Sequence, residues 1–230
     1  PTSWRTRSKN NWGRLGMKYK LGDICTKIGS GATPRGGKDA YCNEGITLVR
    51  SQNVLDFSFS DNGLAFINEE QAARLNNVEV LSGDILLNIT GDSVARACMM
   101  EDSFLPARVN QHVAIIRGKN DVVINRYLLY FLQWKKSHLL QLASGGATRN
   151  ALTKGMIEQL EIDLPQLSQQ KKIVNILGSL DDKIALNNKI NDNLEQQAEA
   201  IYNYMFIVNN DPDWRHGCLK DLVNVRYGKD

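Results

Sequence analysis

The sequence lacks the long apolar runs that mark membrane proteins. No run of about 18 apolar residues could cross a bilayer, and no basic segment followed by an apolar one marks a signal peptide. The four cysteines form no C-x-x-C pair, and the three histidines do not cluster with them. These absences argue against a zinc site and favour free thiols in a reducing compartment. We therefore expect a cytoplasmic protein with no contact to a membrane.

Catalytic motifs are equally scarce. The chain has no G-x-G-x-x-G opening a helix after a strand, no G-x-x-x-x-G-K-[ST] phosphate loop and no G-x-S-x-G elbow. The stretch Asp163-Leu164-Pro165-Gln166 shares little with the Asn/Asp-Pro-Pro-aromatic signature of base methyltransferases, because the second proline and the aromatic residue are missing. We expect no catalytic residues, no bound metal and no cofactor in this chain.

Basic charge is also short outside the first residues. The net charge is +3, but residues 1–18 hold five of the 28 basic residues and no acidic one, so the rest has 23 basic against 25 acidic residues. Any nucleic-acid binding must therefore come from a local patch. We interpret residues 1–18 as a leader outside the fold, because residues 1–16 show no periodic pattern. The alternative is a basic arm that contacts phosphate.

What the sequence does contain is a long heptad pattern from Ser168 to about Phe206. Apolar residues recur at alternating steps of four and three if two asparagines are counted as members, which is the pattern of a left-handed coiled coil. We call these positions the seam: Ile173, Leu177, Leu180, Ile184, Asn187, Asn191, Leu194, Ala198, Ile201 and Met205.

Ser168 stands where an N-cap belongs, and the helix would be about 55–60 Å long. A seam of that length needs a second helix, from this chain or from a second copy. Paired across such an interface, Asn187 and Asn191 would fix register and orientation. The alternative is a fraying or solvated stretch at that point.

The segment before the helix has a mixed pattern, which predicts an α+β fold with a mostly β globular domain over residues 19–164. Polar loops, among them residues 29–37 and 90–93, separate the elements. The expected strands are Ile46–Arg50, Val78–Leu81, Asp84–Ile89, Val94–Met100, Val109–Ile116 and Leu160–Leu164. The expected helices are Glu69–Leu75, capped by Asn68, and a helix capped by Asn125 that runs to about Leu142. The helical arm then covers residues 165–210. Residues 218–223 can be aligned with residues 20–25, so we interpret residues 211–230 as the start of a second domain.

Side chains suited to reading base edges recur in the turn-rich segments of this domain. Arginine can bond guanine through two hydrogen bonds, and asparagine or glutamine can do so with adenine. Each group alone is also what an ordinary polar loop contains, so only their placement on one surface would make a site. The candidates are Thr33, Arg35, Lys38, Arg50, Gln52, Asn53, Asn88, Thr90, Ser93, Arg96, Arg108, Asn110, Gln111, His112, Thr148, Arg149 and Asn150.

Several landmarks occur in an order that is similar to a known family. They are Tyr19–Ile24, the loop Gly29–Pro34, Ser82–Leu87, Asn110-Gln111-His112, Gly145–Thr148, Leu164–Val174 and Leu180–Ile184. From about Tyr19 to Asp230 the chain resembles the DNA-specificity subunit of type I restriction–modification systems. Each motif alone is degenerate, and the resemblance depends on their order and spacing.

The resemblance implies a non-catalytic subunit. Residues 19–164 would be a target recognition domain that reads one half of a split site in double-stranded DNA, and residues 168–206 would be the spacer helix. That helix would dock modification subunits, which bind S-adenosylmethionine and methylate adenine, with the restriction subunit as a further partner. A full subunit usually has two recognition domains and two helices, so this chain resembles a truncated or half-length form.

With one helix in the chain, the seam favours a homodimer with antiparallel helices. Two other functions fit the same residues. A coiled-coil scaffold could carry a globular head that binds protein or glycan, and an antagonist could bind the modification subunit without directing methylation.

Overall fold

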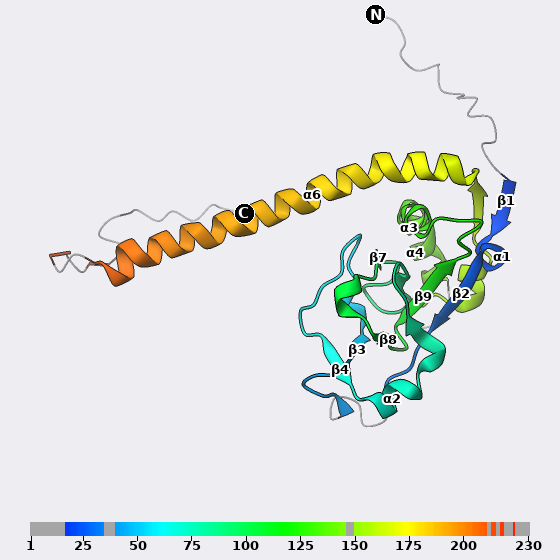
Figure 1. The fold of residues 1–230 in the computed structure, drawn as a ribbon, viewed down its shortest axis with the longest axis horizontal. Helices are drawn as coiled ribbons and strands as arrows, with labels where there is room; N and C mark the ends of the chain where they lie inside the picture. The colour runs from blue at the N-terminus through cyan, green and yellow to red at the C-terminus, as the bar shows by residue number, and fades with distance from the viewer. Residues whose placement is uncertain are drawn as a thin grey trace, which may run out of the picture. The chain divides into compact units, whose positions relative to one another are not determined.

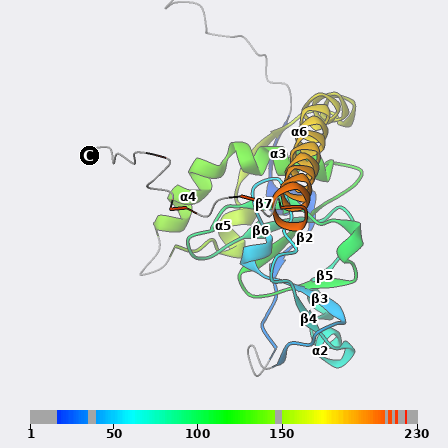
Figure 2. The same cartoon turned by 90° about the vertical axis from the view of Figure 1, so that its left-hand side faces the viewer.

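The computed structural model describes residues 17–34, 40–145 and 150–210, together with Asp213, Trp214, Gly217, Cys218 and Val223. The chain divides into two units, Pro1–Ile176 and Leu177–Asp230 (Figures 1 and 2). The first unit holds all the strands of the described residues, and the second holds most of the long helix. The expected fold class, α+β with a long C-terminal helix, is confirmed.

The first unit contains two four-stranded sheets and a two-stranded ribbon. The first sheet is antiparallel, in the order β2 (Cys25–Ser30), β9 (Val113–Gly118), β6 (Ile85–Asn88) and β7 (Ala97–Met99). The second has the order β4 (Ala65–Ile67), β3 (Ile46–Val49), β8 (Ala107–Val109) and β5 (Glu79–Val80), with β3 and β8 parallel. In the ribbon, β1 (Met17–Lys20) pairs with β10 (Glu161–Leu164).

Strands β6 and β9 are buried on both faces. Ile85, Leu87 and Ile116 join a core cluster that includes residues of the helices, while Leu86 and Ile115 join the cluster of the second sheet. The first sheet is therefore the middle layer of the unit. This explains why β6 and β9 read as continuous apolar runs rather than alternating ones.

The helices of the first unit are short. They are α1 (Leu21–Ile24), α2 (Glu69–Ala73), α3 (Asn125–Trp134), α4 (Lys136–Ser144) and α5 (Lys154–Glu158), with 3-10 turns at Ser51–Asn53, Asn76–Val78 and Asp102–Phe104. The predicted capping box of α2 is confirmed, because Asn68 and Gln71 each bond the other's backbone N–H at 2.9 Å.

The single helix expected over 125–142 is wrong, because it breaks at Lys135 into α3 and α4. Asn125 is also not the cap of α3, which is Ile124. The Asn125 side chain instead accepts from the Gly118 N–H at 2.8 Å and donates to the Gly83 carbonyl at 2.7 Å. It therefore fastens the start of the helix to the ends of β9 and the β5–β6 turn.

The single strand expected over 109–116 is likewise wrong. The chain crosses there from the second sheet to the first: β8 ends at Val109, and β9 begins at Val113. The side chain of Asn110 closes the turn between them by accepting from the His112 N–H at 2.9 Å. Arg108, which precedes the expected strand Val109–Ile116, is in β8.

Strand β7 is also shorter than expected, because residues 94–96 belong to the preceding turn and Ala95 has a φ of 67°. The turn expected over residues 90–93 is present but displaced, because Thr90 forms a bridge with Ala151 and the turn extends to residue 95. At the N-terminus, Met17 and Lys18 belong to β1, so the leader boundary at residue 18 is wrong. Residues 1–16, as well as most of the segment compared with residues 20–25, lie outside the described residues.

The long helix α6 runs from Leu167 to Tyr202 and continues as a π-helix over Asn203–Val208. Because it begins at Leu167, Ser168 is inside the helix and is not its N-cap. The first turns belong to the first unit, where the Gln170 side chain is fully buried. No helix in the described ranges is both long enough and apolar enough to cross a membrane.

Candidate nucleic-acid interface

Three separate segments surround one hollow of about 460 Å³ on the first unit. The segment 51–52 follows β3, the turn 90–96 joins β6 to β7, and residue 112 precedes β9. Five of the predicted site residues line this hollow, so the fold brings together side chains that are up to 60 residues apart in the chain. The lining residues are Ser51, Gln52, Thr90, Gly91, Asp92, Ser93, Arg96 and His112.

The turn between β6 and β7 is held by its own backbone. Val94 N–H donates to the Gly91 carbonyl at 3.1 Å, and Arg96 N–H donates to the Ser93 carbonyl at 3.2 Å. Gly91 and Ala95 have φ angles of 76° and 67°. No atom lies within 4 Å of a Cβ built on Gly91, so its backbone angle and not crowding favours glycine there. Of the described residues that line the hollow, this turn supplies the one arginine, Arg96, and the one carboxylate, Asp92.

A chain of polar side chains extends from the hollow. Gln111 Nε2 lies 3.1 Å from His112 Nε2, and Thr90 Oγ1 lies 2.6 Å from His112 Nδ1. Since the amide nitrogen Nε2 of Gln111 can only donate, His112 Nε2 accepts in this arrangement, and Nδ1 of the neutral ring then donates to Thr90 Oγ1. Thr33 donates to the other end of Gln111. Thr33 and Gln111 therefore adjoin the hollow through His112.

Four predicted base-reading residues are buried and form hydrogen bonds within the fold, which favours a structural role for them. Asn88 donates to the Ser51 carbonyl at 2.8 Å, to the Val54 carbonyl at 3.2 Å and to Ser93 Oγ at 3.1 Å. Asn53 donates to the Ser60 carbonyl at 2.9 Å, and its Oδ1 accepts from the Arg50 N–H at 3.1 Å. Apart from the bond to Ser93 Oγ, these hydrogen bonds join the two amides to backbone groups, and they hold the loops beside the hollow together.

The other two buried residues are Arg108 and Asn110. The Arg108 guanidinium donates to Asn76 Oδ1 at 3.0 Å and to its neighbouring carbonyl of Ala107 at 2.9 Å. Its side chain is only 7% exposed, and its ion pair with Glu79 spans 3.5 Å. Asn110 closes the turn before His112. Both residues therefore stabilise the second sheet and its turn instead of facing solvent.

The remaining candidates lie near the hollow or outside the described residues. Arg50 donates to the Gly63 carbonyl and lies over the Tyr41 ring, 5.4 Å from its centroid. Asn150 is exposed, and its carbonyl accepts from the Gly91 N–H at 3.2 Å, which places it beside the turn. Arg35, Lys38, Thr148 and Arg149 lie outside the described residues.

Three hollow residues, Ser51, Gly91 and Asp92, were not among the sequence candidates. Asp92 lies inside the turn 90–93 that the sequence identifies, and a carboxylate can accept from the amino group of cytosine. The signal that could have selected it was its place between Thr90 and Ser93.

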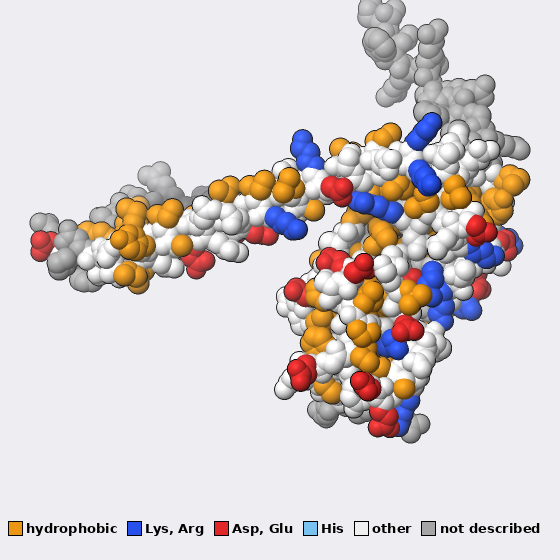
Figure 3. Space-filling model, viewed as in Figure 1, with side chains coloured by type: hydrophobic (Ala, Val, Ile, Leu, Met, Phe, Trp, Pro, Cys, Tyr) orange, Lys and Arg blue, Asp and Glu red, His pale blue; other side chains and the backbone are white. Residues whose placement is uncertain are grey.

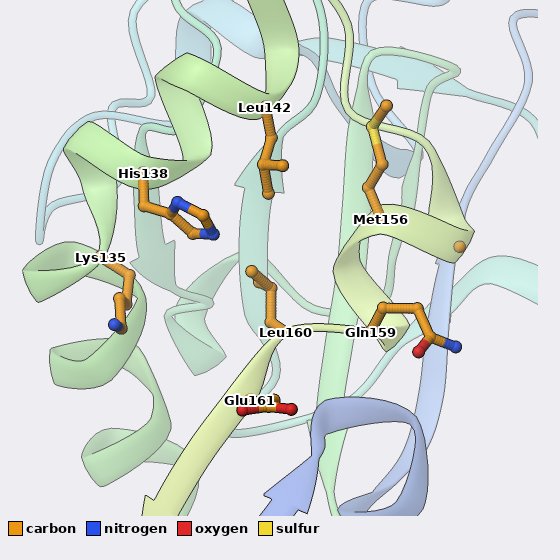
Figure 4. A pocket seen from close by; sticks show the side chains of 8 residues that line it. Lys135, His138, Leu142, Met156, Gln159, Leu160 and Glu161 are labelled. Atoms are coloured by element: carbon orange, nitrogen blue, oxygen red, sulfur yellow. The ribbon is translucent and has the colours of Figure 1, made fainter. Parts of the chain in front are cut away.

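A second hollow of about 640 Å³ lies between α4 and the segment that runs from α5 into β10 (Figure 4). Its walls mix apolar side chains such as Leu142 and Met156 with polar ones such as His138 and Glu161. None of the predicted site residues that the structure describes lines it. Within the described ranges, no group of three or more His, Cys, Asp or Glu side chains could hold a metal ion.

Two cysteines are chemically inert. Burial raises the pKa of the Cys25 thiol and of the Cys98 thiol to about 12. A thiol with so high a pKa is almost entirely protonated at neutral pH and is a poor nucleophile. Neither residue is therefore a candidate for covalent chemistry.

Comparison with known proteins places these observations in a family. The chain is 24% identical over 193 residues to the type I restriction enzyme HindI specificity subunit of Haemophilus influenzae, covering 83% of this chain and 40% of that protein. It is 34% identical over 229 residues to the type I restriction enzyme MjaIX specificity subunit of Methanocaldococcus jannaschii, covering 91% and 52%. The chain thus spans about two-fifths to one half of the length of these curated relatives.

Among solved structures, the HsdS subunit from Thermoanaerobacter tengcongensis has a similar fold, with a TM-score of 0.56 and 18% identity over 80% of this chain and 42% of that one. The family model that describes the type I restriction modification DNA specificity domain matches residues 16–196, which is most of the chain. The chain belongs to the family of type I restriction modification DNA specificity domains.

Proposed function

We propose that this chain is a non-catalytic DNA-reading subunit whose residues 19–164 recognise one half of a split site in double-stranded DNA. The observation that carries the proposal is the hollow, where side chains from three loops of a specificity-domain fold lie together. The family is named for specificity and not for a reaction. Its relatives bear the same name, specificity subunit, in agreement with a chain that is not itself an enzyme.

The chemistry of the hollow matches the edges of bases. Arg96 can donate two hydrogen bonds to guanine, Gln52 can bond adenine through its amide, and Asp92 can accept from cytosine. Ser93 and Thr90 can donate or accept, and Gly91 allows the backbone to approach a phosphate closely. Because Arg96 and Asp92 have opposite charges, the site would depend on base contacts more than on bulk attraction to the backbone.

The partners follow from the same proposal. The spacer arm over residues 165–210, most of which is helix α6, would dock the modification subunit. That subunit would bind S-adenosylmethionine and methylate adenine. The restriction subunit would join the same assembly in the cytoplasm. This chain would need no cofactor of its own. A homodimer through antiparallel α6 helices would bring two recognition domains to one DNA molecule.

Methylated adenine mapped by single-molecule sequencing tests the proposal directly. We expect cells that carry this chain and its modification subunit to methylate a defined split motif. Arg96→Ala should relax the motif at one position, whereas Arg74→Ala, an exposed arginine on the flank of α2, should leave it unchanged. Both variants must still co-purify with the modification subunit.

Other outcomes would overturn the proposal in distinguishable ways. Co-purification with the modification subunit but no methylation motif would indicate an antagonist. No association with the modification subunit, together with no selective binding of duplex DNA, would indicate a scaffold.

A further inference from the structure

Phe57 holds an exposed ring on a backbone conformation that phenylalanine rarely adopts. Its φ is 64°, and 50% of its surface is exposed. Left-handed backbone crowds the Cβ of every residue except glycine, and bulky side chains are outliers there. Glycine or asparagine would relax this position, so the ring is present despite an energetic cost. Strained residues of this kind cluster at functional sites.

The exposure of Phe57 would carry little weight without this strain. Apolar side chains lie among charged ones on the surface of the first unit (Figure 3), as they do on most folded proteins. Among the described residues, the non-glycine residues with a positive φ are Phe57 and Ala95. Ala95 belongs to the turn that joins β6 to β7, and Phe57 is bonded to the first residue of β7. Both strained residues therefore lie at the same edge of the first sheet, where the hollow is.

The loop tip that carries Phe57 is fastened to the first unit. The Phe57 N–H donates to the Ala97 carbonyl at 2.9 Å. The same carbonyl accepts from Gln133 Nε2 at 2.7 Å, and that nitrogen also donates to Asp56 Oδ1 at 3.2 Å. Lys136 forms an ion pair with the Asp56 carboxylate. These contacts fix the backbone beneath the ring, so little conformational freedom would be lost when the ring contacts a ligand.

The ring itself is supported from the side of α3. Its centroid lies 6.1 Å from that of the Tyr130 ring, and the two planes are tilted by 42°. Aromatic pairs at this separation are favourable. The ring of Phe57 is therefore held against α3 while half of its surface stays open, which suits a contact with a small apolar group.

Phe57 stands beside the hollow. Ala97 directly follows Arg96, which lines the hollow, and the loop of Phe57 also supplies Gln52 to it. Residues joined by such a backbone bond have Cα atoms roughly 5–6 Å apart, and consecutive Cα atoms are about 3.8 Å apart. The Cα atoms of Phe57 and Arg96 are therefore within about 10 Å of each other. Because bases follow one another every ~3.4 Å along a strand, this separation corresponds to about three base pairs.

We propose that Phe57 reads a thymine through its C5-methyl group. The inference rests on the proposed function and adds an apolar reader to the polar side chains of the hollow. Thymine is the one standard base that presents a methyl group in the major groove, and phenylalanine is among the side chains that contact it there. Removing one methyl group from water contributes about fourfold to affinity. The ring of Phe57 would supply the apolar surface that buries this group.

Deoxyuridine tests this contact, because it differs from thymidine only by that methyl group. The complex of this chain with its modification subunit is titrated with duplexes of the mapped motif, each carrying deoxyuridine in place of one thymidine. We expect one replacement to weaken binding about fourfold, and the others by less than about twofold. The sensitive thymine should lie within about three base pairs of the position that Arg96→Ala relaxes.

Two variants assign the effect to the ring. Phe57→Gly should bind the thymidine and deoxyuridine duplexes equally, because glycine adopts the positive φ and removes the ring. Its melting temperature should stay close to that of the parent, since relief of strain offsets the lost packing on Tyr130. Leu81→Ala is the matched control. Leu81 is 45% exposed and precedes β6, at the other end of that strand from the hollow, so this variant should keep the fourfold difference.

Several results would overturn the proposal. They are equal binding of all duplexes by the parent complex, a motif without thymine in the stated range, and a Phe57→Gly complex that still discriminates against deoxyuridine. A Phe57→Gly chain that no longer co-purifies with the modification subunit would show that the ring contacts protein instead. Each of these results leaves the proposed function standing if the motif and its relaxation by Arg96→Ala persist, whereas the absence of any motif would overturn both.

Discussion

The side-chain oxygen of Gln170 accepts a hydrogen bond from the backbone N–H of Ile124 at 2.9 Å. Its amide nitrogen also donates to the Pro165 carbonyl at 2.8 Å and to the Val122 carbonyl at 3.0 Å. Ile124 is the N-cap of α3, so one buried side chain from α6 satisfies backbone groups around the start of another helix. This is the contact that fastens the beginning of α6 to the first unit.

We therefore expect Gln170→Leu to lower the free energy of unfolding by roughly 2–4 kcal/mol, because it leaves buried backbone groups without partners. Urea denaturation followed by circular dichroism measures the effect. Gln196→Leu, an exposed glutamine on the same helix, should change stability by less than about 0.5 kcal/mol. Equal effects of the two variants would contradict a role for Gln170 as an anchor.

Substitutions of Asn88 and Gln52 should separate an effect on stability from an effect on base recognition. Asn88 is fully buried and links the segment after β3 to the β6–β7 turn, so we expect Asn88→Ala to cost roughly 2–3 kcal/mol of stability. Gln52 is exposed, so Gln52→Ala should alter stability by less than about 0.5 kcal/mol while changing the preferred base at one position. Denaturation and methylation mapping of both variants check this. A stable Asn88→Ala protein with a changed motif would restore Asn88 as a base reader.

The sequence predicts the elements of this fold better than their connections. The capping box of Asn68 and Gln71 is local, and the sequence therefore reveals it. The run from Val109 to Ile116 reads as one strand because both faces of β9 are buried, which hides the crossing between sheets at Asn110. Burial on both faces removes the alternation that would have shown the boundary.

The sequence predicts which types of side chain form the site, but not which individual residues face the hollow. An asparagine that closes a turn and one that reads a base look alike in sequence, so Asn88 and Asn110 were chosen together with Gln52. What distinguishes them is a backbone partner, which the fold supplies to Asn88 from the distant segment 51–54 and to Asn110 from His112 in the same turn. Gln170 was missed for the same reason, since its partners belong to residues more than 40 positions away as well as to its own neighbours.

Stability should decrease in alkaline solution through the buried thiols. The pKa of Cys25 and of Cys98 is raised from 9.0 to about 12 in the folded protein, mainly by burial. Between these values the unfolded chain loses thiol protons that the folded chain retains, so the free energy of unfolding falls as pH rises from 9 towards 12. Denaturation of the parent chain and of Cys98→Ala at pH 7, 9 and 10 measures this. The decrease should be smaller in the variant, and an identical decrease would exclude Cys98 as a cause.

The two seam asparagines should behave as a coupled pair. Asn187→Leu places a leucine opposite Asn191 of the second copy and leaves that amide without a partner at two symmetric places, so we expect the dimer dissociation constant to rise by at least tenfold. Asn187→Leu/Asn191→Leu removes both amides, which should restore or strengthen the dimer but allow slipped registers. Sedimentation of the parent chain, of each single variant and of the double variant measures the affinity. If the two single effects simply add in the double variant, the asparagines do not face each other across the helix pair.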